Sequence, residues 1–208
     1  MKKPKFSHLF PKEKTEQRHL PTKPAKKAVL VLFTLFLLLY INYKPYLTTP
    51  HHITSISEYF FTIYQFIINQ TLGIVHEGGH GVCYILPCPK FMMISMGTVF
   101  QWLFPLGIAY YYKKRGNQTA FLIGLFILGI SMDYTAWYMS TAHEGAILPA
   151  HKSFLGVDAL HDFHYIFSSL GVLGYESLIS GMTRVMGYLL MIGAVIGMFF
   201  EAFSNKHQ

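Results

Sequence analysis

The chain is short of charge and of cysteine, and each shortage narrows its class. Charged residues make up 13% of the 208 residues, whereas apolar residues make up 52%. Soluble domains usually carry about 25% charged residues, so this sequence lacks the polar surface that a water-soluble fold needs. The two cysteines, Cys83 and Cys88, are too few for a disulfide framework and indicate no particular compartment.

What the sequence has instead is a series of long apolar stretches. They cover Ala28–Tyr43, Ser57–Leu86, Phe91–Tyr112, Ala120–Met139 and Ser177–Phe203. A helix needs about 20 apolar residues to cross a bilayer, and most of these stretches approach that length. The sequence therefore predicts an all-α integral membrane protein with a bundle of about four to six transmembrane helices. Residues 28–203 would form one polytopic membrane domain, followed by a short tail, 204–208.

Acidic residues are scarce at the N-terminus. Residues 1–27 hold nine Lys/Arg against Glu13 and Glu16, and also contain four prolines. This composition predicts a disordered basic tail. A basic tail before the first apolar stretch is typical of an uncleaved signal anchor with a cytoplasmic N-terminus. The tail has few aromatic residues, so we expect no nucleic-acid partner, and place the protein in the lipid bilayer of a bacterial inner membrane.

The sequence predicts a helix more clearly for the second apolar stretch than for the start of the third. Ser55 and Glu58 have the spacing of a helix capping box, and the helix is expected to run from about Ser57 to Leu86. Phe91–Thr98 fits either a helix or a short re-entrant segment. If every stretch crossed the membrane once, the Lys113–Arg115 cluster would fall outside, against the positive-inside tendency. The topology after Leu86 therefore stays open.

The second stretch contains a metal-ligand motif. His76-Glu77-Gly78-Gly79-His80 matches H-E-x-x-H, which on a helix sets both imidazoles on one face, one turn apart. Two such rings can bind Zn²⁺, and Glu77 can take a proton from a zinc-bound water. An ionisable side chain at bilayer depth costs about 2.5–3.5 kcal/mol or more, so three together need a partner such as a cation. Cys83 lies on the same face and could also bind zinc, but cysteine is more often a small buried apolar residue.

A catalytic zinc site needs a third protein ligand and an open position for water. One candidate is Asp133, an acid inside the fourth apolar stretch. The other is the His161-Asp162-Phe163-His164 segment, in which His161, Asp162 or His164 could bind the metal. Arg184, in the last stretch, either snorkels to the interface, pairs with Asp133 or Glu77, or stabilises negative charge that develops in a reaction.

These motifs resemble those of the site-2 protease class of intramembrane zinc metalloproteases. The resemblance rests on His76-Glu77-Gly78-Gly79-His80 and on Met132-Asp133-Tyr134, which stands where the class has an L-D-G motif. It implies Asp133 as third ligand, and hydrolysis of peptide bonds within or beside the membrane. The chain is also similar, over about residues 70–170, to bacterial membrane proteins with H-E-x-G-H, F-Q-x-x-x-P (Phe100–Pro105) and a later H-D pair. That likeness favours His161-Asp162.

The leading hypothesis is a membrane-embedded zinc metalloprotease acting on membrane or membrane-adjacent proteins, with Glu77 as the catalytic acid and base. Two alternatives remain. A di-iron oxidase or desaturase would use the spaced pairs His76/His80 and His161/His164. The second alternative is non-enzymatic: a metal carrier, or a structural bundle in which the motif is vestigial.

Overall fold

The computed structural model describes residues 21–47, 55–150, 153, 156 and 158–204. The described residues form six α-helices: α1 (Lys23–Tyr43), α2 (Ile56–Ile85), α3 (Lys90–Lys114), α4 (Gln118–Ser140), α5 (Asp162–Ser169) and α6 (Glu176–Phe203). Two short 3-10 helices, η2 (Ala142–Glu144) and η3 (Leu173–Tyr175), and one antiparallel strand pair, β1 (Ile147–Leu148) with β2 (Ala159–Leu160), complete the fold. The prediction of an all-α bundle is confirmed.

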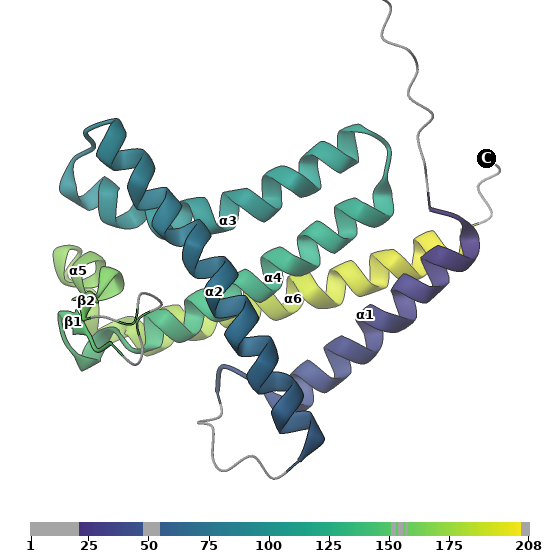
Figure 1. Ribbon diagram of the computed structural model, residues 1–208, viewed down its shortest axis with the longest axis horizontal. Coiled ribbons are helices and arrows are strands. Elements are labelled where there is room, and N and C mark those ends of the chain that lie inside the picture. The colour runs from purple at the N-terminus through teal and green to yellow at the C-terminus, as the bar shows by residue number, and fades with distance from the viewer. Residues whose placement is uncertain (1–20, 48–54, 151–152, 154–155, 157, 205–208) are drawn as a thin grey trace, which may run out of the picture.

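Four of these helices are long and apolar enough to cross a membrane: α1, α3, α4 and α6. The protein is therefore an integral membrane protein. The helix that carries the metal-ligand motif, α2, is not one of the four, and it runs across the other long helices (Figure 1). Its exposed face carries large apolar side chains at helical spacing, including Ile63, Phe66, Ile67 and Ile74. Such a stripe suits contact with lipid along the side of a helix.

The expected helix boundaries are close to the observed ones. The Ser55 hydroxyl accepts a hydrogen bond from the Glu58 backbone N–H, and the Glu58 carboxylate accepts one from the Ser55 backbone N–H, which confirms the capping box. Residues 91–98 are the first turns of α3 and not a re-entrant segment, because Ile94, Gly97 and Thr98 bury one helical face. The helix then continues through Pro105.

The N-terminal boundary lies earlier than expected. Helix α1 begins at Lys23, inside the segment predicted to be disordered, and Pro24 stands in its first turn, where its missing N–H leaves no helical bond unmade. Residues 1–20 and 205–208, which hold most of the two predicted tails, lie outside the described residues.

Two hydrophobic clusters define opposite ends of the bundle. At what we call the basic end, the start of α1, the start of α4 and the end of α6 meet through Leu30, Leu122, Met198 and Ala202. At the opposite end, the loop end, the start of α3, the end of α4 and the short α5 meet through Ile94, Met139, Phe163 and Phe167. The loop end also carries β1 and β2 (Figure 1). The candidate site lies at this end.

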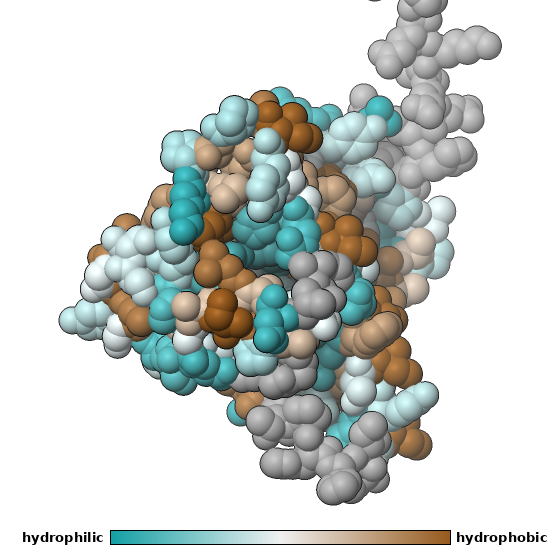
Figure 2. All heavy atoms as spheres, turned by 60° about the vertical axis from the view of Figure 1, so that its left-hand side comes forward, coloured by the Kyte–Doolittle hydropathy of each residue, from teal (hydrophilic) through white to brown (hydrophobic). Residues whose placement is uncertain are grey.

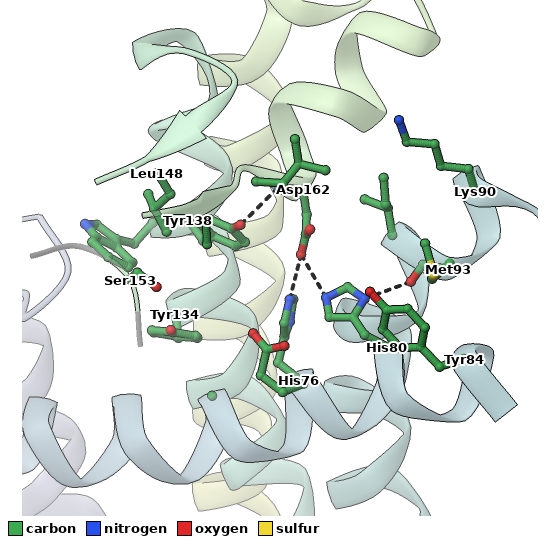
Figure 3. A pocket seen from close by; sticks show the side chains of 16 residues that line it. His76, His80, Tyr84, Lys90, Met93, Tyr134, Tyr138, Leu148, Ser153 and Asp162 are labelled. Carbon is green, nitrogen blue, oxygen red and sulfur yellow. Dashed lines mark hydrogen bonds and ion pairs between the residues drawn. The ribbon is translucent and has the colours of Figure 1, made fainter. Parts of the chain in front are cut away.

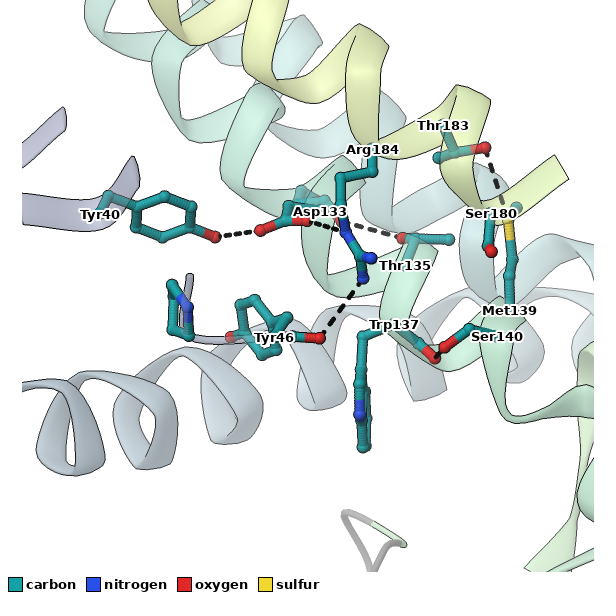
Figure 4. Close-up of polar contacts among 12 residues, drawn as sticks. Tyr40, Tyr46, Asp133, Thr135, Trp137, Met139, Ser140, Ser180, Thr183 and Arg184 are labelled. Carbon is teal, nitrogen blue, oxygen red and sulfur yellow. Dashed lines mark hydrogen bonds and ion pairs between the residues drawn. The ribbon is translucent and has the colours of Figure 1, made fainter. Parts of the chain in front are cut away.

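Between the two ends, α4 and α6 pack closely around a buried ion pair. A Cβ at Gly129 would lie 2.6 Å from the Gly187 carbonyl oxygen, so only glycine allows the helices to approach this far. One turn later, the Arg184 Nε donates to Asp133 Oδ1 at 2.8 Å, and the Tyr40 hydroxyl donates to Asp133 Oδ2 at 2.6 Å (Figure 4). Arg184 therefore pairs with Asp133, which is one of the alternatives that the sequence offered.

Candidate metal centre

Helix α2 and the start of α5 bring together two imidazoles and one carboxylate. The Nε2 atoms of His76 and His80 lie 2.7 Å and 3.2 Å from the same oxygen, Oδ2 of Asp162 (Figure 3). The potential ligand atoms of the three residues all lie within 4.8 Å of one another. Two ligand atoms on one tetrahedral zinc ion are about 3.4 Å apart, so the spacing suits a shared ion after small adjustments.

The other nitrogen of each ring is held by an oxygen atom. Nδ1 of His76 lies 3.1 Å from Oε1 of Gln101, and Nδ1 of His80 lies 2.8 Å from the backbone carbonyl oxygen of Met93. Both oxygens are acceptors, so each Nδ1 carries a proton. This tautomer leaves Nε2 of each ring free to bind a metal, as supporting contacts do in known metal sites.

The orientation of Gln101 is fixed by helix α4. Its amide nitrogen donates to Oγ of Ser131 at 3.1 Å and to Oγ1 of Thr135 at 3.2 Å, so its Oε1 must face His76. Gln101 is 1% exposed, which makes it one of the most buried polar residues. A chain of buried hydrogen bonds therefore runs from α4 through α3 to His76.

This arrangement requires a positive charge between the rings and the carboxylate. In each ring both nitrogens face oxygen acceptors, whereas a neutral imidazole carries only one proton. Burial alone would lower the pKa of His80, but the hydrogen bond and charge of Asp162 raise it to about 9. Burial likewise disfavours the charged form of Asp162, yet hydrogen bonds from His76 and His80 lower its pKa. Protons or a metal cation can supply this charge.

Glycines in α2 and α3 allow the two helices to approach each other closely at the ligand atoms. A Cβ at Gly97 of α3 would lie 2.6 Å from Nε2 of both His76 and His80, so any larger residue would press on the ligand atoms. A Cβ at Gly79 would lie 2.3 Å from the Met96 carbonyl oxygen, so this glycine allows α2 to rest on α3. The donor set fits a divalent cation bound by two histidines and an aspartate.

Asp162 is positioned by its place at the first turn of α5. Its backbone N–H donates to the Tyr138 hydroxyl oxygen at 3.0 Å, and the Tyr138 ring stacks on the ring of His161 with 4.5 Å between centroids. His161 caps the helix by accepting from the backbone N–H of His164. Helix α4 thus holds the start of α5 against α2 through Tyr138.

The other candidate ligands have different partners. Asp133 is held by Arg184 and Tyr40, as described above, and does not belong to the cluster. Nε2 of His161 lies 3.1 Å from the Thr141 hydroxyl, and burial lowers the pKa of His161 to about 4, which keeps this ring neutral near pH 7. Nδ1 of His164 contacts a backbone carbonyl instead. Of the alternatives, the structure brings only Asp162 to the two histidines within the described part of the chain.

The two cysteines form a bond that the sequence did not indicate. Cys83 is buried, as predicted, but it forms a disulfide with Cys88. The bridge joins the last turns of α2 to the segment before α3, one helical turn after His80. It could not be predicted from spacing alone, because it depends on the turn by which the chain reverses after Ile85.

A cavity of about 280 Å³ lies beside the cluster. It is lined by His76, Glu77, His80 and Asp162, by aromatic residues of α4, and by Leu148, Ala159 and Leu160 of the strand pair. The Glu77 side chain is exposed and borders the same space as the three ligands. Figure 2, which looks toward this end of the molecule, shows hydrophilic residues around a hollow with hydrophobic residues beside it. The cluster can therefore be reached from outside.

No family model, curated protein or solved structure matches this chain. The chemistry of the site must therefore be argued from its own residues. Sequence reasoning did not assign roles to Gln101, Met93, Gly97 or Tyr138. For Gln101 a signal existed, since an amide within an apolar stretch needs a partner. For the Met93 carbonyl and for Gly97 the sequence carries none.

Proposed function

We propose that this protein is a membrane-embedded zinc-dependent metalloprotease that hydrolyses peptide bonds of membrane or membrane-adjacent proteins. The observation that carries the proposal is the placement of His76 and His80 against one oxygen of Asp162, with Glu77 on the same cavity. Two histidines and one carboxylate, with a position left for water, form a zinc site of the hydrolytic kind. When bound, zinc would supply Lewis acidity, polarising the scissile carbonyl and making water more acidic.

Each residue then has a defined task. His76, His80 and Asp162 hold the ion, while Gln101 and the Met93 carbonyl fix the orientation of the rings. Glu77 takes a proton from the attacking water and gives it to the leaving amine, as a general base and then a general acid. The cavity, lined by Tyr134, Trp137 and Tyr138, has room for one or two side chains of the substrate.

We place the protein in a bacterial inner membrane with a cytoplasmic N-terminus, on the strength of the basic residues that precede α1. The substrate is a peptide or protein in contact with the bilayer. A di-iron site is less well supported, because His161 and His164 contact other groups and the described residues offer a single three-ligand cluster.

Glu77→Gln tests the proposal most directly. The amide keeps the shape of the side chain but cannot take a proton, so we expect peptide hydrolysis to fall by about 10²–10⁴-fold. Zinc content, measured by mass spectrometry on purified protein, should stay at one ion per chain. Unchanged hydrolysis would refute the catalytic role and favour a metal carrier. Two iron ions per chain would favour the oxidase alternative.

A further inference from the structure

The four spanning helices alternate in direction between the two ends of the bundle. Helices α1 and α4 start at the basic end, and α6 ends there, as the packing of Leu30, Leu122 and Ala202 shows. The Lys26 ammonium also lies 2.6 Å from the Glu201 carboxylate near the end of α6. Helix α3 starts at the loop end, where Ile94 packs against α4 and α5, and runs back (Figure 1).

Helix α2 therefore adds no crossing of its own. It follows α1, which has reached the loop-end half of the bundle, and precedes α3, which starts at the loop end. Contacts at both ends of α2 lie in that half: Phe61 packs with Tyr40 and Tyr43 late in α1, and His80 bonds to the Met93 carbonyl at the start of α3. With α2 lying across the bundle, the turn between α3 and α4 comes to the same side as the start of α1.

Basic residues gather at that shared side. Lys23, Lys26 and Lys27 stand at the start of α1, and Lys113, Lys114 and Arg115 stand at the end of α3. The described residues in the loop-end half are more acidic, with Glu58, Glu144, Asp158, Asp162 and Glu176 against Lys44 and Lys90. Lysine and arginine near the ends of spans mark the cytoplasmic face, so this distribution places the basic end in the cytoplasm. The crossing pattern removes the conflict over Lys113–Arg115.

The disulfide gives an independent indication of the same orientation. The Cys83–Cys88 bridge lies between α2 and α3, at the loop end. Disulfides form and persist on the oxidising side of a membrane and are rare in the cytosol. The distribution of charge and the oxidation state of the cysteines thus agree, although they depend on different residues.

We propose that the metal site opens on the non-cytoplasmic face of the membrane, and that its substrates are peptide segments that leave the bilayer on that face. This inference rests on the proposed function for the nature of the reaction, but not for the sidedness. The apolar stripe of α2 would lie along the outer lipid layer, with its other face toward the cavity. A segment emerging from a neighbouring span would then reach Glu77 without crossing the membrane.

Cysteine labelling tests the sidedness without any need for activity. Ala146→Cys places a thiol on an exposed residue before β1 at the loop end, and Gln118→Cys places one on an exposed residue at the basic end. In spheroplasts, a membrane-impermeant maleimide should label Ala146→Cys at once, and Gln118→Cys only after permeabilisation. The native pair should react only after reduction. Reversed labelling or equal labelling in intact spheroplasts would overturn the orientation. So would native cysteines that react without reductant only after permeabilisation.

The substrate class is tested by mapping new N-termini in membranes that contain the wild-type protein or Glu77→Gln. Termini that depend on Glu77 should fall in segments of membrane proteins on the non-cytoplasmic side, close to a span. Glu77-dependent termini in cytoplasmic segments would refute the substrate class. The absence of any Glu77-dependent terminus would instead refute the protease function, and labelling would still decide the orientation.

Discussion

Two buried carboxylates in this molecule are stabilised in different ways. Asp133 is 1% exposed and Asp162 is 7% exposed, so both are largely removed from water. Asp133 has a guanidinium at 2.8 Å and a phenol at 2.6 Å. Asp162 faces two imidazoles, and no lysine or arginine of the described residues pairs with it. The first carboxylate is neutralised by the protein itself, whereas the second depends on protons or on an added cation.

The chemistry of the partners explains the difference in role. Arginine stays charged at any ordinary pH, so the Asp133–Arg184 pair is permanent and holds α4 to α6. Imidazole can lose its proton and bind a metal with the same nitrogen. Therefore the carboxylate beside histidines is the one that fits a metal site, although the sequence offered both residues as candidate third ligands.

Exchanging each carboxylate for an amide should give opposite results. Asp162→Asn removes a metal ligand, so we expect zinc affinity to fall by about 100-fold or more, with little loss of fold. Asp133→Asn leaves Arg184 buried without a counter-charge, which should destabilise the protein by about 3–5 kcal/mol while zinc content is kept. Zinc titration and thermal unfolding in detergent measure the two effects. Loss of zinc in Asp133→Asn but not in Asp162→Asn would reverse the assignment.

A matched pair of glycines in α3 tests the space at the site. Gly97→Ala places a methyl group 2.6 Å from both ligand nitrogens, so we expect zinc affinity to fall by about tenfold or more. Gly107→Ala is the control, because nothing lies within 4 Å of its Cβ, and alanine there should raise helix stability by up to about 1 kcal/mol. Equal zinc affinity in the two variants would show that the ion does not lie between the rings.

The pH dependence of zinc affinity is the mildest test. In the zinc-free protein Asp162 raises the pKa of His80 to about 9, so below that pH the ion must displace a proton from this ring. Affinity should therefore fall by about tenfold for each pH unit below about 9, and level off above it. Competition with a zinc chelator over this range measures the slope. A flat profile would mean that His80 is not a ligand.

Local features of the site were predictable from the sequence, and its long-range partners were not. The H-E-x-x-H spacing and the capping box at Ser55 each depend on residues within one or two turns, and the structure has both the α2 helix and its cap. The candidate third ligand, Asp162, lies 86 residues after His76, and its position depends on how Tyr138 holds the start of α5. Sequence could offer Asp162 only as one of several alternatives.

Two further features also depend on the fold and not on residue spacing. The disulfide between Cys83 and Cys88 depends on the turn after α2. The helical structure of residues 91–98 depends on the face that Ile94 and Gly97 bury.

The two rings differ in what holds them, and this sets how the site can be tuned. His80 is oriented by the backbone carbonyl oxygen of residue 93. Any residue at that position would provide this oxygen, as long as the helix is kept. His76 is oriented by the side chain of Gln101, which a single substitution can change. A substitution at position 101 can therefore change the basicity of the His76 ring, and with it the preference of the site for one metal. The orientation of the His80 ring would stay the same.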